Sequence, residues 1–227
     1  MALILCIETS HQTASVALCN DEACIAYRTS TSQKEHASFL QPAIQDLMKE
    51  AGLTLGQVDA LSVSIGPGSY TGLRVGLASA KGICYALSKP LITIDTLTII
   101  AHLAAKDALK KNKTSFIVPM IDARRNEVFV SIFDHELNMI APPQAHILTD
   151  SSFDDLLSQP VIFAGDGTNK WKLQCQHQNA SFKDLRPTAK DMCLLSIDAW
   201  QKQNFAPLYQ TAPLYAKEFY STIQKIS

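Results

Sequence analysis

The sequence lacks the features of a membrane-spanning, exported or strongly nucleic-acid-binding chain. No apolar stretch approaches the length that spans a bilayer, and the opening run ALILCIETS is interrupted by Glu8 and has no basic lead, so no signal peptide is expected. Twenty Lys and Arg stand against 21 Asp and Glu, and the longest basic cluster is the pair Lys110-Lys111. A net charge of -1 provides little attraction for phosphates. We therefore expect a cytoplasmic protein that contacts nucleic acid only through a partner.

Cysteine pairs with metal-binding spacing are also missing. The chain has six cysteines but no C-x-x-C motif, and most of them stand among apolar neighbours. This pattern predicts buried, reduced thiols and no structural zinc. The cysteines are Cys6, Cys19, Cys24, Cys84, Cys175 and Cys193.

The glycine-rich segment SIGPGSYTGLRVGLASAKG, residues 64–82, matches neither common phosphate-binding motif. The Walker pattern requires a glycine, four further residues and then G-K-[ST], and the only lysine within residues 64–82 is Lys81. The dinucleotide pattern G-x-G-x-x-G fails because Thr71 stands where the third glycine is required. The glycines therefore call for another explanation.

What the chain does contain is an apolar, α/β-patterned sequence. With 227 residues and 47% hydrophobic content, it can bury a large core without disulfides or metal. The first half reads β-β-β-α-β-α-β-α, and residues 115–134 resemble a second beginning in which Asp122 aligns with Glu8. We infer a duplicated architecture with an N-terminal domain at 1–110 and a more divergent C-terminal domain at 111–227.

Residues typical of helix ends mark the limits of two helices in the first half. Ser32 and Glu35 form a capping-box pattern before a helix over 35–51 that stops at Gly52, while Pro42 either kinks this helix or marks a start near Phe39. A second helix is expected over 69–88, before Pro90.

The second half is less regular. Pro142-Pro143 interrupts it, a helix is expected after Asp150, and PVIFAG, residues 160–165, reads as a buried strand. Thr188 and Asp191 open a helix that reaches about Gln203.

The helix over 69–88 carries a row of small side chains. Gly72, Gly76 and Ala80, with Ser79, would let a neighbouring backbone approach closely, although each glycine inside a helix costs roughly 1 kcal/mol relative to alanine. The helix is apolar on nearly every side, so it is expected to lie between two layers. One layer is its own sheet. The other is either a partner's helix or the helix over 35–51 of the same chain, and the sequence leaves both open.

Several strings together resemble the TsaB (YeaZ) family. They are ILCIETSHQTASVAL, KEHASFLQPAIQDLMKEAGL, SIGPGSYTGLRVGLASAKGICYAL, IDTLTIIA, IDARRNEVFVSIF and APLYAKE. The resemblance covers residues 1 to about 135 strongly and the remainder loosely. It implies two duplicated actin-like (ribonuclease H-like) subdomains, each a mixed sheet with flanking helices.

The resemblance also implies a function. Proteins of this family are non-catalytic subunits that support the homologous enzyme TsaD in N6-threonylcarbamoylation of adenosine-37 of tRNAs, together with the ATPase TsaE. It implies self-association and contact with TsaD through the first two helices, with tRNA met only in the complex. The expected contact residues are His36, Leu40, Ile44, Leu47, Gly72, Arg74, Val75, Gly76, Leu77 and Ala80.

No catalytic residue, metal site or bound cofactor is expected in the isolated chain, and ATP and metal would act through the partner subunits. Alignment with the catalytic paralogue puts Thr96 and Ile100 where its two metal-binding histidines stand, and isoleucine has no lone pair to donate. His102 lies two residues out of register and reads as an ordinary, partly buried histidine.

Three carboxylates and one glycine loop suggest an alternative function, that of a self-sufficient nucleotide-dependent transferase or ATPase of the actin-like superfamily. Glu8, Asp95 and Asp122 end strands where actin-like enzymes hold magnesium, although Asp95 also suits a helix N-cap. Gly165 and Gly167, with Glu8, are candidates for weak nucleotide binding.

Two polar pairs are weaker candidates. Ser10-His11 suggests a hydrolase, but side chains that are adjacent in sequence usually point apart. Arg124-Arg125 is read as a solvated turn or as a contact to tRNA phosphate within a complex, and a free-standing tRNA-binding module is the third function considered.

Overall fold

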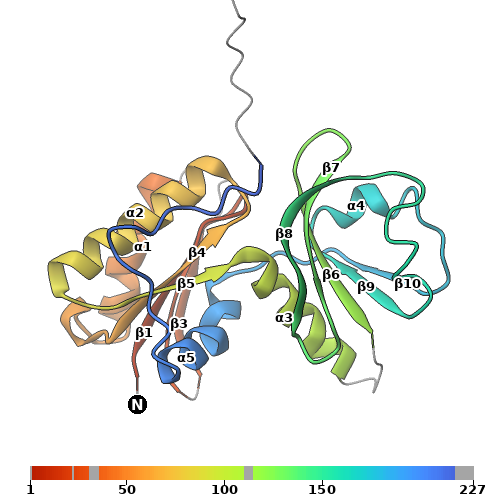
Figure 1. Ribbon diagram of the computed structural model, residues 1–227. Coiled ribbons are helices and arrows are strands. Elements are labelled where there is room, and N and C mark those ends of the chain that lie inside the picture. Colours follow the sequence, from red (N-terminus) through yellow and green to blue (C-terminus); the bar gives the residue numbers. More distant parts are fainter. Residues whose placement is uncertain (1, 22, 31–35, 110–114, 218–227) are drawn as a thin grey trace, which may run out of the picture.

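The computed structural model describes residues 2–21, 23–30, 36–109 and 115–217. It consists of two lobes side by side, each built on a five-stranded sheet (Figure 1). The predicted fold class, a duplicated α/β architecture, is confirmed.

The first sheet has the strand order β3-β2-β1-β4-β5. Its strands are β1 (Ile4–Glu8), β2 (Ser15–Cys19), β3 (Cys24–Thr29), β4 (Ala60–Gly66) and β5 (Leu91–Asp95). β1, β2 and β3 form an antiparallel meander, and β4 and β5 extend it in parallel. Both faces of β1 and β2 are covered, so every residue of these two strands is buried.

The second sheet repeats this topology with the order β10-β9-β6-β7-β8. Its strands are β6 (Phe116–Asp122), β7 (Glu127–Phe133), β8 (Met139–Ile147), β9 (Val161–Ala164) and β10 (Ala180–Lys183). β6 therefore corresponds to β1, and the strands end at Asp122 and Glu8 as the sequence alignment predicts. The duplication is confirmed.

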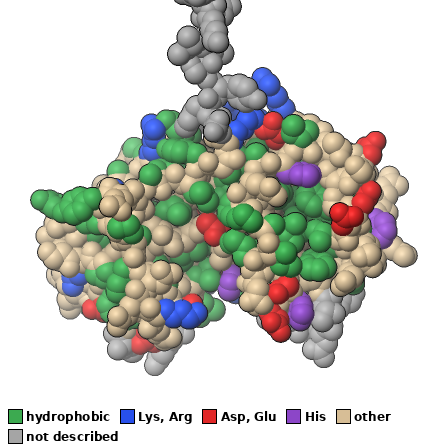
Figure 2. Space-filling view, viewed as in Figure 1, with side chains coloured by type: hydrophobic (Ala, Val, Ile, Leu, Met, Phe, Trp, Pro, Cys, Tyr) green, Lys and Arg blue, Asp and Glu red, His purple; other side chains and the backbone are tan. Residues whose placement is uncertain are grey.

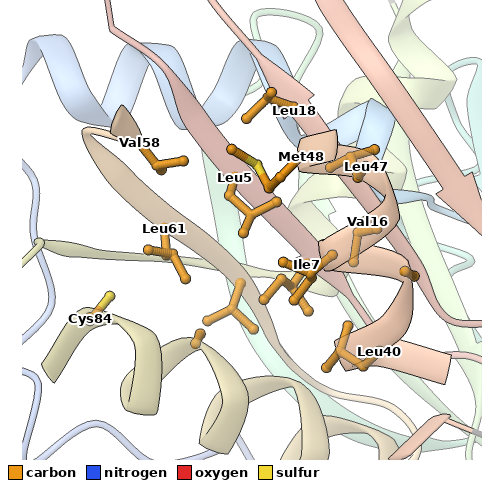
Figure 3. Close-up of a cluster of buried hydrophobic side chains, with 14 of the residues drawn as sticks. Leu5, Ile7, Val16, Leu18, Leu40, Leu47, Met48, Val58, Leu61 and Cys84 are labelled. Atoms are coloured by element: carbon orange, nitrogen blue, oxygen red, sulfur yellow. The ribbon is translucent and has the colours of Figure 1, made fainter. Parts of the chain in front are cut away.

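Two helices cover one face of the first sheet. The helix α1 (His36–Glu50) and the helix α2 (Tyr70–Leu87) pack on alternate residues of β1 and β2, including Leu5, Ile7 and Val16 (Figure 3). α1 continues through Pro42, and Gly52, with φ +67°, ends it, whereas the Ser32–Glu35 capping pattern falls outside the described residues. A 3-10 turn, η1 (Leu55–Gln57), then leads into β4.

The lobes exchange helices across the expected domain boundary at residue 110. The helix α3 (Thr96–Leu109) packs mainly on the second sheet, with Leu97 and Ile100 against Ile117 and Ile162. The 3-10 turn η2 (Ala189–Met192) and the helix α5 (Cys193–Gln201) return to the free face of the first sheet (Figure 1). Each lobe thus contains residues from both halves of the sequence.

The second half departs from two expectations. Residues 150–158 form consecutive turns instead of a helix, because Phe153 has a left-handed φ of 65° and the Ser152 hydroxyl accepts a hydrogen bond from the backbone of Thr149. β8 runs through Pro142 and Pro143, which is possible because an edge strand needs donors on one side only. The strand over 161–164 and the Thr188–Asp191 capping box are confirmed.

The last described segment, residues 206–217, runs back along the first lobe. The Ala206 amide donates to Leu91, the Leu214 amide donates to Ile65, and the Lys81 ammonium donates to the carbonyls of Tyr209 and Thr211. This segment covers a side of α2 that neither the sheet nor α1 covers. Within the described ranges, no helix has the length and hydropathy to cross a membrane.

Candidate functional site

The small residues of α2 pack against their own chain. A Cβ on Gly72 would lie 2.0 Å from the carbonyl oxygen of Thr9, and a Cβ on Gly76 would lie 2.2 Å from the Thr9 Oγ1. Both distances are shorter than real Cβ contacts. The close approach inferred from the sequence therefore exists, but the backbone it admits is the end of β1.

Seven of the ten predicted contact residues are consequently buried within the first lobe. Figure 3 shows Leu40 of α1 pointing into the cluster formed with β1 and β2. Their apolar surface packs on the sheet or on Thr9, and contact of these residues with a partner stays a prediction. The seven residues are Leu40, Ile44, Leu47, Gly72, Gly76, Leu77 and Ala80.

The other three predicted residues remain accessible. Arg74 is exposed, with its guanidinium carbon 4.0 Å from the centroid of the Tyr70 ring and its Nε donating to the Tyr215 hydroxyl. Val75 is half-buried. His36 is also half-buried, and its Nε2 donates to the carbonyl of His11 at 2.9 Å. Arg74 thus lies beside the beginning of α2, and His36 lies beside the loop after β1.

Sequence reasoning missed one glycine of α2, Gly82. Gly82 is exposed, and a Cβ at this position would meet no atom of the described residues within 4 Å. It shares the exposed side of the helix with Ala78 and Tyr85, whose side chain is 69% exposed. We call Thr71, Arg74, Val75, Ala78, Gly82 and Tyr85 the outer face of α2. The clue in the sequence was Gly82 itself, which falls outside the i, i+4 row of the two buried glycines.

The lobes enclose a cleft of about 920 Å³ between the loop after β1 and the turn after β6. Its lining includes Ser10, His11, Arg124, Arg125 and Asp166. The space-filling view shows the two lobes in contact, with side chains of both charges on the surface (Figure 2). A cavity of this volume is large enough for a small ligand.

His11 provides the cleft with a buried nitrogen that lacks a hydrogen bond. Its Nδ1 lies 2.8 Å from the Ser10 Oγ, whereas its Nε2 has no hydrogen-bond partner among the described residues and lies 4.0 Å from the Oδ2 of Asp166. The expectation that Ser10 and His11 point apart is therefore wrong, because the turn after β1 folds one side chain onto the other. A Ser-His-Asp relay needs a bonded carboxylate at the second nitrogen, and 4.0 Å is too long for that bond.

The turn after β6 presents two arginines in an unusual conformation. Arg124 and Arg125 have φ values of 68° and 48°, a region that side chains other than glycine, asparagine and aspartate seldom adopt. Asp122 accepts hydrogen bonds from the Arg124 amide and the Lys170 ammonium, both at 2.6 Å, and this anchors the turn. The arginine pair is thus held at the cleft.

Of the three strand-end carboxylates, Asp122 alone lines the cleft. Glu8 is fully buried, its Oε1 accepts from the Ser10 amide at 2.6 Å, and burial raises its pKa above the usual value. Asp122 is exposed at the cleft, whereas Glu8 is not part of the lining. Asp95 accepts from the Thr98 amide and hydroxyl, which confirms its role as N-cap of α3.

The predicted nucleotide glycines are also explained by packing. Gly165, with φ +116°, would place a Cβ 2.1 Å from the Met120 carbonyl oxygen, and a Cβ on Gly167 would lie 3.0 Å from the backbone of Met120 and Ile121. Neither glycine lines the cleft, although Asp166 and Asn169 of the same loop do. This loop leads into the short helix α4 (Thr168–Trp171).

The positions that align with metal-binding histidines lie inside the fold. Thr96 and Ile100, on α3, have no exposed surface. His102 is half-buried, and burial lowers its pKa, so the ring is neutral at physiological pH.

Comparison with known proteins identifies the family. The family model described as "TsaD: tRNA N6-adenosine threonylcarbamoyltransferase" matches residues 28–198. The tRNA threonylcarbamoyladenosine biosynthesis protein TsaB of Escherichia coli is 27% identical over 222 residues, 94% of each chain. Its Bacillus subtilis counterpart is 29% identical over 175 residues, 74% of this chain and 73% of that one.

A solved structure agrees with this assignment. YeaZ from Pseudomonas aeruginosa is 27% identical and superposes with a TM-score of 0.78, covering 95% of this chain and 100% of its own. The Acidaminococcus fermentans (R)-2-hydroxyglutaryl-CoA dehydratase component A, 9% identical with a TM-score of 0.52, covers 90% of this chain and 100% of its own and shares the fold alone. The chain therefore belongs to the TsaD family and, within it, to the TsaB (YeaZ) group.

Proposed function

We propose that this protein is an accessory subunit in the N6-threonylcarbamoylation of adenosine-37 of tRNAs, and that it supports TsaD by docking to it without contributing chemistry of its own. The observation that carries this proposal is the burial of Thr96 and Ile100 in α3, where the catalytic paralogue is expected to present metal ligands. A buried isoleucine at such a position cannot bind a metal. ATP and metal would then be bound by TsaD and the ATPase TsaE, and this chain would contact tRNA only in the assembled complex.

The outer face of α2 is the surface we propose for docking. A glycine inside a helix costs about 0.5–1 kcal/mol relative to alanine, and none of the described residues packs on Gly82 in return. A partner's helix that approaches there would gain close contact with Ala78 and Gly82, and Tyr85 would provide an aromatic anchor. A second copy of this chain could use the same face in the absence of TsaD.

The experiment is co-elution of the full chain with TsaD. Gly82→Arg adds a long charged side chain in open space, so the fold should persist while co-elution is lost. Gly56→Arg is the matched control, because Gly56 is also exposed and a Cβ added to it would meet only the Thr54 Oγ1, at 3.9 Å. Unchanged co-elution of Gly82→Arg would exclude this face, and loss in both variants would exclude a specific effect.

The cleft favours a second candidate function, binding of a phosphorylated ligand by this chain itself. The buried, unbonded Nε2 of His11 and the paired Arg124 and Arg125 support it. Calorimetry of the purified chain with ATP and magnesium separates the two functions. Micromolar binding with turnover that disappears in the double variant Arg124→Ala with Arg125→Ala would replace the docking proposal, whereas no heat and no turnover would exclude this second function.

A further inference from the structure

Three thiols from distant parts of the sequence meet on the face of the first sheet that α5 covers. They are Cys6 on β1, Cys19 on β2 and Cys193 on α5, and their Sγ atoms all lie within 4.8 Å of one another. The Sγ atoms of Cys6 and Cys19 are 3.7 Å apart. Cys6 and Cys19 have no exposed surface, and Cys193 is 6% exposed. We call these residues the thiol triad.

The triad has the dimensions of a metal site. A point equidistant from three sulfurs separated by 3.7 to 4.8 Å lies about 2.1–2.8 Å from each of them, a range that includes the Zn–S bond length of about 2.3 Å. Thiolates select soft d10 cations such as Zn(II) and Cu(I) over magnesium and calcium. The donor set and its spacing therefore agree on one class of ion.

A hydroxyl lies beside the sulfurs. The Ser196 Oγ, on the same helix as Cys193, is 3.4 Å from the Cys6 Sγ and 2.7 Å from the Ser62 Oγ. A hydroxyl in this position, which also lies 2.8 Å from the Met192 carbonyl oxygen, can hydrogen-bond to a thiolate of a three-coordinate site. This hydrogen bond reduces the cost of charge in a buried site.

We propose that Cys6, Cys19 and Cys193 form a buried thiolate site for one thiophilic d10 cation, Zn(II) or Cu(I). The bound ion would cross-link α5 to β1 and β2, and thus join residues at opposite ends of the chain. Because α5 follows the whole second sheet in sequence, such a link would hold the returning segment on the first lobe. The site is independent of the cleft and of the outer face of α2.

The test uses the full chain, reduced and freed of metal by a chelator. Cd(II), as a spectroscopic probe for Zn(II), and Cu(I) are titrated separately, with thiolate-to-metal charge-transfer absorption and native mass spectrometry as readouts. We expect one ion per chain with charge-transfer bands. Cys19→Ser and Cys193→Ser should each lower the affinity at least about tenfold, because each removes one of three ligands. Competition with chelators of known affinity distinguishes the Zn(II) arm from the Cu(I) arm.

Cys84→Ser and Cys175→Ser are matched controls, because both thiols are buried but lie outside the triad. They should bind the ion as the unmodified chain does. A second measurement covers variants that fail to fold: alkylation of the unmodified chain in mild denaturant, with and without metal, followed by peptide mapping. Protection confined to the triad supports the site. Absence of a bound ion in the folded chain, or equal protection of all six cysteines, would overturn it.

Discussion

The contact between α2 and Thr9 makes a quantitative prediction about stability. In Gly76→Ala, the new methyl carbon would lie 2.2 Å from the Thr9 Oγ1, so α2 or the end of β1 must shift. Overpacking of this kind costs about 1–3 kcal/mol, and the gain in helix propensity returns up to about 1 kcal/mol. The free energy of unfolding should therefore fall by about 1–2 kcal/mol, or about 2–8 °C in Tm for a chain of this size.

The partner atom can be removed, which makes the prediction sharper. The Thr9 Oγ1 is buried and has no hydrogen-bond partner in the described part of the chain, so Thr9→Ala alone should cost little. In the double variant Thr9→Ala with Gly76→Ala, most of the lost stability should return. Gly72→Ala provides the contrast, because its Cβ would meet the Thr9 carbonyl oxygen at 2.0 Å and no change of the Thr9 side chain can relieve that.

Urea denaturation followed by circular dichroism measures all four variants, and a double-mutant cycle isolates the coupling between positions 9 and 76. Gly82→Ala is the control, since it adds the same methyl group in open space and should stabilise the chain by about 0.5–1 kcal/mol. An unchanged stability of Gly76→Ala, or additive effects in the cycle, would refute the packing explanation of the α2 glycines.

Three further predictions concern titration, capping and the cleft turn. Burial raises the pKa of Glu8 in the folded chain, so the protonated carboxyl stabilises the fold fully below the usual pKa of 4.5, and this stabilisation is lost as pH rises through the pKa of the folded state. Glu8→Gln should therefore have a larger free energy of unfolding than the unmodified chain at pH 7.5, by a margin that shrinks towards pH 4.5. Denaturation of both proteins at the two pH values measures this margin. Asp95→Ala should lower the free energy of unfolding by about 1 kcal/mol through loss of the α3 N-cap, whereas Asp95→Asn should cost less, and equal losses would argue against capping. Arg125→Gly should raise the free energy of unfolding by about 1 kcal/mol, because glycine adopts the left-handed φ of 48° without strain. Thermal denaturation measures the change, and a loss of stability in this variant would show that the Arg125 side chain holds the turn after β6.

Much of the fold follows from local patterns in the sequence. Alternating and continuous apolar runs indicate the meander β1–β3, Gly52 ends α1, and Asp95 caps α3, because each depends on residues close together in the chain. The alignment of Asp122 with Glu8 extends this to the duplication. The turns at 150–158 were mispredicted because the left-handed Phe153 and the Ser152 hydroxyl break a pattern that otherwise favours a helix.

The site was harder to predict because it depends on contacts between distant residues. The sequence shows that Gly72 and Gly76 need a close neighbour, but it cannot show that this neighbour is Thr9 and not a partner. The exchange of α3 and α5 between lobes is likewise set by tertiary packing. The same exchange brings Cys193 to Cys6 and Cys19, which no spacing rule for metal motifs would detect.

The proposal that this chain docks to TsaD through the outer face of α2 is tested most directly by the rate of threonylcarbamoyl transfer to tRNA. The rate is measured in a mixture of this chain with TsaD, TsaE and ATP. We predict that Gly82→Arg lowers the rate at least about tenfold, since a lost hot spot of about 2 kcal/mol exceeds the 1.4 kcal/mol that corresponds to one decade, and that raising the variant's concentration restores it. Arg125→Ala, at the cleft, should leave the rate unchanged. A rate that survives Gly82→Arg but is lost in Arg125→Ala would contradict docking through α2 and place the function in the cleft.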